Sequence, residues 1–190
     1  MPDHFDLIAP YYDRIFHRQS VQALTNHVAP QANHRLLDVG GGTGRIAQYF
    51  VKHVHQVCIL DPSPGMLQEG QQKGLCITQG MAERIPFADQ TFDRIIAIDS
   101  FHHLLNQRQA ARELLRVLAP GGRLIVEEPN IAHCAVKLIA LGEKLLMMRS
   151  HFLSAAKMRS LFEQNGAQVT IEEENTTLWL IISKPLQAYQ

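Results

Sequence analysis

The sequence predicts an α/β fold in three layers, with helices on both faces of a mostly parallel β-sheet. Short apolar runs, which are typical of buried strands, alternate along the chain with stretches of helical apolar spacing. The run 93–99 is nearly continuous in apolar residues, as expected for the centre of a parallel sheet. Two β-rich runs close the chain, so an antiparallel C-terminal strand is also expected. The 190 residues suit a single domain, 1–190.

The stretch 36–47 is the one around which the rest of the chain is organised. Its apolar run ends in an acid, passes through a cluster of glycines and then takes up helical spacing. This pattern predicts a strand over 35–39, a tight turn, and a helix over about 44–53. Glycines in the turn allow positive φ and the close approach of a ligand, and the helix N-terminus offers N–H groups to an anionic one. A nucleotide-like ligand is therefore the first hypothesis.

The spacing of the glycines indicates which nucleotide. A dinucleotide fingerprint needs G-x-G-x-x-G, but its last position is occupied by Arg45. The chain instead has G-x-G-x-G, formed by Gly40, Gly42 and Gly44, with Asp38 ahead of it. This resembles motif I of the class I S-adenosylmethionine (SAM) methyltransferases. In that family the loop wraps the methionine end of the cofactor, and the preceding acid lies near its ammonium group.

The first thirty residues lack strand character and are expected to form an N-terminal cap, with a helix over 21–28 that Pro30 ends. The pattern F-D-x-x-A-x-x-Y-D, which starts at Phe5, resembles the opening of the quinone-biosynthesis C-methyltransferases. In those proteins this segment folds over the cofactor site, so the resemblance places Tyr12 close to SAM. The alternative is that the segment only covers the sheet.

A second strand, over 56–60, ends in Asp61, which lies 21 positions after Gly40. An acid at this spacing accepts both ribose hydroxyls in nucleotide-binding βαβ units. Asp61 could instead cap the following helix, but Ser63 and Pro64 already supply an N-cap and a first-turn proline. The sequence therefore favours the ribose-binding interpretation.

The next two elements resemble the parts of the family that hold the adenine. D-x-S-x-x-M-L contains Pro62 and Met66, and the family places the Met against the adenine. After a short strand over 76–79, the family writes G-D-A-E-x-L-P-F-x-D, in which the first Asp accepts from the adenine amino group. This chain has Met81 there, and a thioether is a weak acceptor, so the contact is lost or passes to a backbone carbonyl or water. The N–H of Ala82 can still serve the ring.

Strand 93–99 leads into the loop S-F-H-H-L. Ligands of open α/β sheets bind at the carboxyl ends of the strands, so Asp99 and this loop should face the cofactor and its methyl group. The family often carries H-H-L here, and neither it nor this chain has the D-P-P-Y signature of adenine amino methylation. His102 or His103 is the candidate general base, because imidazole titrates near neutrality. The alternative is a histidine that caps the next helix or packs under it.

The segment from 107 to 127 resembles motif III of the family. A helix over 107–118 carries an apolar stripe and ends at P-G-G, before a strand over 123–127. The sequence L-L-R-V-L-A-P-G-G is close to the family's own. This segment serves as scaffold, and Arg116 is expected to be a solvated charge.

The C-terminal third is expected to cover the substrate and complete the sheet. The mostly apolar stretch 131–148 predicts a helix that covers the sheet edge, although it could also line an apolar substrate pocket or touch a lipid surface. The family places its substrate-selecting insertion near here, so 131–165 is assigned to substrate-covering helices, the last over 154–165. Runs 167–173 and 177–183 should form a hairpin at an antiparallel edge.

Composition excludes several classes of function. The 18 basic and 18 acidic residues cancel, so no nucleic-acid partner is indicated. Three irregularly spaced cysteines argue against a disulfide framework and fit a reducing cytoplasm. The N-terminus lacks the features of a signal peptide, and no apolar run reaches the roughly 18 residues of a membrane span. A cytoplasmic protein is therefore expected.

No metal site is expected either. Cys58 and Cys76 fall in predicted strands, at positions that core cysteines usually occupy, which argues against a thiol-dependent arsenic methyltransferase. His53 and His55 flank a helix–strand junction and should be solvated.

The resemblance covers residues 5–126 motif by motif. It implies a seven-stranded Rossmann-like fold, SAM as cofactor with S-adenosylhomocysteine (SAH) as product, and a small-molecule acceptor. The quinone-biosynthesis resemblance favours an aromatic or quinone-like compound as that acceptor. Two alternatives stay open. A non-catalytic SAM-binding partner subunit would be consistent with Met81, and a nicotinamide oxidoreductase would share Asp61 but not the glycine spacing. Nothing in the sequence indicates an oligomeric state.

Overall fold

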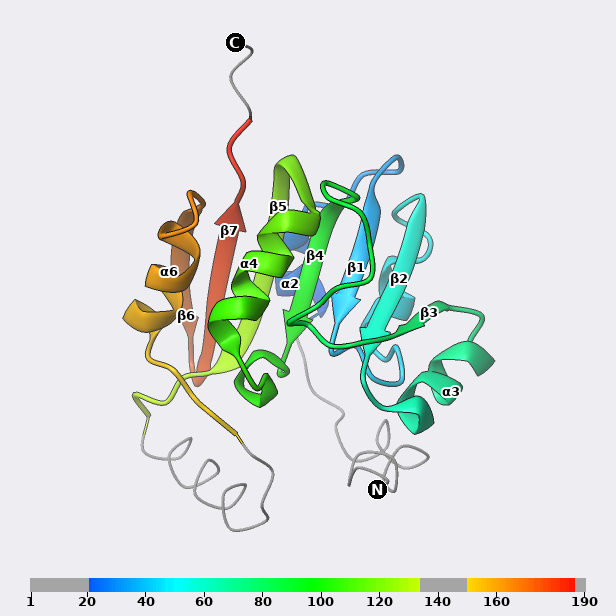
Figure 1. Cartoon of the computed structure of the whole chain (residues 1–190), viewed down its shortest axis with the longest axis horizontal. Helices are drawn as coiled ribbons and strands as arrows, with labels where there is room; N and C mark the ends of the chain where they lie inside the picture. The colour runs from blue at the N-terminus through cyan, green and yellow to red at the C-terminus, as the bar shows by residue number, and fades with distance from the viewer. Residues whose placement is uncertain (1–20, 134–149, 187–190) are drawn as a thin grey trace.

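The computed structural model describes residues 21–133 and 150–186 (Figure 1). Three predictions therefore lie wholly or partly outside the described residues: the position of Tyr12, most of the N-terminal cap, and the helix within 131–148.

Seven strands form one sheet in the order β3-β2-β1-β4-β5-β7-β6. The strands are β1 Arg35–Val39, β2 Gln56–Asp61, β3 Cys76–Gln79, β4 Phe92–Ile98, β5 Leu118–Pro129, β6 Gln168–Glu174 and β7 Thr177–Ser183. The first five pair in parallel, whereas β7 runs antiparallel to both β5 and β6. The predicted mostly parallel, seven-stranded sheet with an antiparallel C-terminal strand is confirmed.

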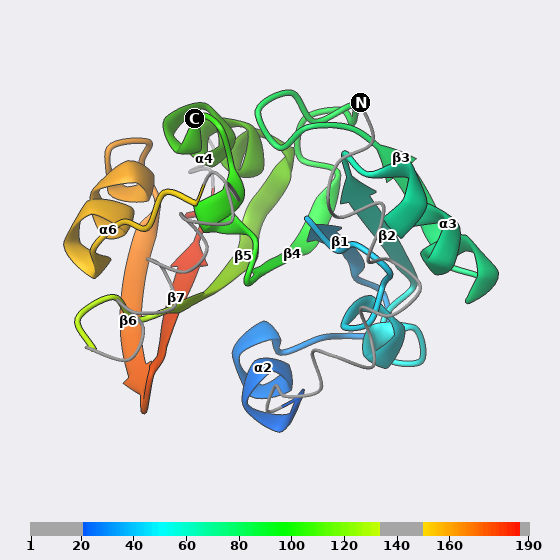
Figure 2. The same cartoon turned by 90° about the horizontal axis from the view of Figure 1, so that it is seen from below.

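Helices lie on both faces of this sheet, which gives the three layers. They are α2 Val21–Val28, α3 Pro64–Gln72, α4 Gln107–Val117 and α6 Ala155–Glu163, with the 3₁₀ turns η1 Ala47–Phe50 and η2 Phe101–His103. Figure 2 shows α4 and α6 on one face and α2 on the other. In β4, Ile95 belongs to the core cluster of α4 and α6, and Ile96 to the cluster of α2. The continuous apolar run of β4 thus reflects burial on both faces.

The predicted C-terminal hairpin forms at the edge of the sheet, from β6 and β7. The antiparallel strand β7 lies inside the sheet, and the edge strand is β6. Most side chains of β7 are buried, whereas β6 ends in three exposed glutamates, Glu172 to Glu174. An apolar strand gains more from two neighbours, and charges on an edge strand discourage further pairing.

The helix predicted over 44–53 is wrong, because only η1 forms there. Gly44 has a φ of +72°, so the chain is not yet helical at that point. The N–H groups of Tyr49 and His53 donate to the carbonyls of Ile46 and Phe50, three residues back, whereas the N–H of Gln48 donates to Gly44, four residues back. The stretch therefore does not continue as an α-helix. The start of β5 also differs: the chain pairs with β4 already at Leu118, and the P-G-G turn lies inside the strand.

The prediction for Arg116 is also wrong, because this side chain fastens the loop before β4 to α4. Its guanidinium lies 2.8 Å from Glu113 and 2.7 Å from Asp89, and it donates to the carbonyl oxygens of Ile85 and Phe87. The hydrogen bonds to Glu113 and Asp89 raise the pKa of Arg116. A sequence pattern could not reveal these contacts, since three of the four partners lie 27 to 31 residues away along the chain.

Candidate functional site

A cleft lies at the carboxyl ends of β1 to β4, with an empty volume of about 1030 Å³ that includes open solvent at its mouth. Ligands of open α/β sheets bind at this edge, beside the point where the strand order reverses between β1 and β4. The predicted site residues that line it are Asp38, Gly40, Gly42, Asp61, Pro62, Met66, Met81, Ala82, Asp99 and His103. Gly44 and His102 do not line this cleft.

Gly42 and Gly44 of the glycine loop have different surroundings. Gly42 has a φ of +53°, and a Cβ there would meet nothing nearer than the Sδ of Met66 at 3.7 Å. Its missing side chain therefore leaves open space at the cleft. Gly44 also has a positive φ, but a Cβ there would lie 2.3 Å from Cδ1 of Leu75. Gly44 thus lies where the loop packs against the core, and its left-handed backbone favours glycine.

Asp61 joins the glycine loop to the start of α3. Its Oδ2 accepts a hydrogen bond from the N–H of Gly42 at 2.9 Å, and its Oδ1 accepts one from Ser63 at 2.8 Å. Ser63 itself is the N-cap, because its Oγ accepts from the N–H of Met66 at 3.1 Å, as predicted. The Asp61 carboxylate lines the cleft, and a carboxylate oxygen can accept more than one hydrogen bond.

Asp38 and Arg45 present complementary unpaired atoms beside the glycine loop. Asp38 is 2% exposed, and its Oδ2 has no hydrogen-bond partner among the described residues. Burial raises the pKa of Asp38 to about 7; repulsion by Asp61 adds to this shift, and Arg45 opposes it. The Nε of Arg45 is likewise buried and unpaired in the described part of the chain. Both residues line the cleft, so a negative and a positive side chain lie at the same wall.

The two candidate bases on η2 have different surroundings. His102 is 4% exposed, and its Nδ1 lies 2.6 Å from Oε2 of Glu128 at the end of β5. The other oxygen of Glu128 accepts from the N–H of Phe101 at 2.8 Å. The His102 ring stacks on the ring of Phe152, with the two centroids 4.3 Å apart. It also contacts the ring of His103, whose centroid lies 4.0 Å away. Since His103 lines the cleft, a contiguous line of side chains runs from β5 to the cleft.

Sequence reasoning missed Arg45, Glu127 and Glu128. Glu127 is buried, and its Oε2 has no partner within residues 21–133 and 150–186. Burial, together with the charges of Asp99 and Glu128, raises the pKa of Glu127 to about 8. One signal could have found the two glutamates. Consecutive acids at the carboxyl end of a buried parallel strand lie at the same sheet edge as Asp38 and Asp99.

The remaining predictions concern metals, cysteines and membranes. Within the described ranges, no three His, Cys, Asp or Glu side chains gather as a metal site would require. Cys58 is buried as expected, but Cys76 is exposed, because β3 is an edge strand. His53 and His55 are exposed, as predicted. Among the described helices, none has the length and apolar character needed to cross a membrane.

Comparisons with known proteins extend these observations. The family described as a methyltransferase domain matches residues 37–126. The chain is 35% identical over 141 residues to the ubiquinone/menaquinone biosynthesis C-methyltransferase of Roseobacter denitrificans, a match that covers 65% of this chain and 56% of the relative. It is 32% identical over 187 residues to the demethylmenaquinone methyltransferase of Clavibacter sepedonicus, covering 92% of this chain and 74% of the relative.

A solved structure shows the same fold. A SAM-dependent methyltransferase of Thermotoga maritima, 21% identical, superposes with a TM-score of 0.78 over 95% of this chain and 98% of its own. The chain spans about half the length of the Roseobacter relative, at 56%, and about three quarters of the Clavibacter one, at 74%. The sequence identity and the fold agree. The chain belongs to the class I SAM-dependent methyltransferases, together with the quinone-biosynthesis C-methyltransferases.

Proposed function

We propose that this protein is an active methyltransferase that moves the sulfonium methyl group of SAM to a quinone-like aromatic acceptor. The observation that carries the proposal is a pair of buried atoms, Asp38 Oδ2 and Arg45 Nε, that have no partner among the described residues, in a cleft that the histidine loop also borders. An ordinary packing role would leave neither atom without a partner. The relatives' names, which specify methyl transfer in ubiquinone and menaquinone biosynthesis, support the acceptor class.

The residues of the cleft divide the binding task among them. Asp38 and Arg45 hold the ammonium and the carboxylate of the cofactor, and Asp61 accepts from the ribose hydroxyls. Pro62, together with the side chain of Met66, forms an apolar wall for the adenine. When bound, SAM supplies an electrophilic methyl group, so the protein's contribution is to orient the acceptor in line with it and to exclude water.

The histidines and Glu128 supply proton transfer. A hydroquinone ring carbon becomes a stronger nucleophile when a neighbouring hydroxyl loses its proton. His103 borders the cleft and takes this proton. The ring of His102 packs against His103 and orients it, and the Nδ1 of His102 is itself held 2.6 Å from the carboxylate of Glu128. A positioned general base typically contributes about 10²- to 10⁴-fold to the rate.

The test is an assay of the purified chain with SAM and a reduced naphthoquinol that lacks its ring methyl group. We expect equimolar formation of SAH and a quinol that is heavier by one CH₂ unit, measured by mass spectrometry. His103→Gln should lower turnover by about 10²-fold or more, and His102→Gln by less. Full turnover in both single variants and in the double variant would show that neither histidine is the base.

The same assay separates the proposal from the alternative of a non-catalytic partner subunit. The relatives do not favour that alternative, since they are named as enzymes. It would require SAM binding without turnover on any tested acceptor, and a stable complex with another protein. Benzoquinols and simple catechols should therefore be tested in parallel with the naphthoquinol.

A further inference from the structure

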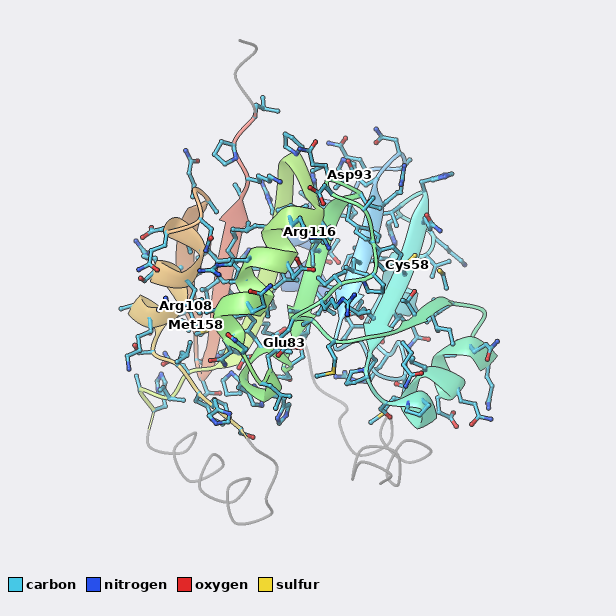
Figure 3. All side chains as sticks on the ribbon, in the orientation of Figure 1. Cys58, Glu83, Asp93, Arg108, Arg116 and Met158 are labelled. Atoms are coloured by element: carbon cyan, nitrogen blue, oxygen red, sulfur yellow. The ribbon has the colours of Figure 1, made fainter. Side chains whose placement is uncertain are left out.

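Two cysteine thiols face each other across neighbouring strands of the sheet. Cys58 on β2 and Cys76 on β3 are direct partners in the parallel register, and their sulfur atoms lie 3.1 Å apart. Figure 3 shows Cys58 on β2, next to the edge strand β3. Neither cysteine lines the cleft, so the methyl transfer proposed above makes no use of this pair.

The positions of the two residues suit a disulfide bond. Neighbouring strands of a sheet lie about 4.8 Å apart, and the Cα atoms of bonded cysteines are usually about 4.4 to 6.8 Å apart. Cα atoms at such a distance allow a bridge without movement of the backbone. The two sulfur atoms need to approach by about 1 Å to reach the length of an S–S bond.

The two thiols differ in access and in protonation. Cys76 is exposed on the edge strand, whereas Cys58 is 3% exposed. Burial, together with the hydrogen bond to Cys76, raises the pKa of the Cys58 thiol to about 12. The S–H of Cys58 therefore keeps its proton near neutral pH and donates to the sulfur of Cys76. An oxidant in solution thus meets the sulfur of Cys76 first.

We propose that Cys58 and Cys76 form a reversible disulfide when the protein meets hydrogen peroxide, and that this bond joins the edge strand β3 covalently to β2. First, the Cys76 sulfur attacks one peroxide oxygen and the O–O bond breaks, which yields the Cys76 sulfenic acid and water. The Cys58 sulfur then attacks the sulfenic sulfur and the S–O bond breaks. The hydroxyl group leaves with the Cys58 proton as a second water. Two thiols are thus oxidised, and one peroxide molecule is reduced to two waters.

The site of the bond makes it reversible and connects it with the cleft. Because Cys76 is exposed, thiols in solution can attack the bond, and exposed disulfides are typically the labile, regulatory ones. β3 leads directly into residues 80–83, which line the cleft. The disulfide therefore fastens the strand from which this part of the cleft wall extends.

The test is treatment of the folded full chain with hydrogen peroxide, followed by alkylation of the remaining thiols, trypsin digestion and mass spectrometry. Trypsin cuts after Lys73 and so separates the two cysteines. We expect their peptides to be linked, with a mass lower than the sum of the two by two hydrogen atoms. The number of free thiols should fall by two, from the three in the sequence, and dithiothreitol should restore it. Cys134→Ser, the matched control, should form the same linked pair.

Two proteins with a single thiol test the order of reaction. Cys58→Ala combined with Cys134→Ser leaves only Cys76, which should gain oxygen and form no link within the chain. Cys76→Ser combined with Cys134→Ser leaves only Cys58, which should stay reduced for as long as the first protein is being oxidised. If peroxide adds oxygen to Cys76 of the wild type and no linked peptides form, the proposed disulfide is wrong. Equal rates of oxidation in the two single-thiol proteins would refute the assignment of Cys76 as the first sulfur to react.

Discussion

Replacing Asp38 with Asn should stabilise the ligand-free protein and weaken its binding of SAM. Asp38 is buried, its Oδ2 is unpaired in the described structure, and burial raises its pKa from 3.8 to about 7. Between these two pH values the folded protein holds a proton that the unfolded chain has released. The free energy of unfolding therefore falls as the pH rises through this interval, and it stays low above pH 7.

The pKa shift sets the magnitude of the effect. A rise of about 3 units, at about 1.4 kcal/mol per unit, corresponds to an upper limit of about 4 kcal/mol at pH 8. Asn has nearly the same shape, keeps an oxygen that can accept the N–H of Ala47, and cannot ionise. At pH 8 the Asp38→Asn protein should thus be more stable than the wild type, and the difference should shrink toward pH 5.

The affinity should change in the opposite direction. An amide cannot pair with an ammonium group as a carboxylate does, so we expect SAH to bind Asp38→Asn about tenfold more weakly at pH 8. Urea unfolding at four pH values between 5 and 8 gives the stabilities, and calorimetry gives the affinity, with Glu163→Gln as an exposed control. A loss of stability at pH 8 would contradict the burial argument. An unchanged affinity would show that the ammonium group does not lie beside Asp38.

Three further substitutions test other parts of the site. Gly42→Val places a β-branched side chain at a φ of +53°, in the open space of the cleft, and should lower SAH affinity at least about tenfold by calorimetry; an unchanged affinity would mean that the loop does not hold the cofactor. Arg116→Met removes two ion pairs and two hydrogen bonds to carbonyl oxygens, so urea unfolding should show a loss of about 2 kcal/mol, with none expected if these contacts are replaced by water. Glu128→Gln weakens the partner of His102 and should lower kcat about tenfold with little change in KM, whereas Glu128→Asp should recover part of it. Equal kcat in all three proteins would assign Glu128 to packing alone.

Local patterns predicted most of the strands, because strand burial leaves a direct mark on composition. The bounds of β1 and β3 match the prediction, and those of β2 and β4 differ by one residue at one or both ends. The failure at 44–53 has a local cause that the pattern did not weigh: a glycine with positive φ keeps the first turn from being helical. The position of β7 inside the sheet, with β6 at the edge, follows from the difference in apolar character between these two strands, and neither strand shows it alone.

Some residues of the site could be identified from their spacing in the sequence, whereas others are revealed only by tertiary contacts. Residues at or just beyond the carboxyl ends of the strands, such as Asp38, Asp61 and His103, could be named from the sequence, and they line one cleft. Glu128 could not be connected with His102, because the two residues are 26 positions apart and only the tertiary fold brings them together. Glu83 was visible as part of a motif, but only the structure shows that its Oε1 accepts from the N–H of Asn106 and that its Oε2 has no partner among the described residues.

The sequence by itself determined the α/β class, the glycine loop, the acid after the second strand and the family resemblance. These features depend on spacing along the chain, where a period of burial or a glycine at a given offset has one physical interpretation. Tertiary structure alone decided which charges are paired, which are left unpaired, and which face the cleft. These properties depend on burial and on partners from distant segments. Those neighbours set the pKa of a buried carboxylate such as Asp38 or Glu127, the free energy that its burial costs and its capacity to bind a ligand.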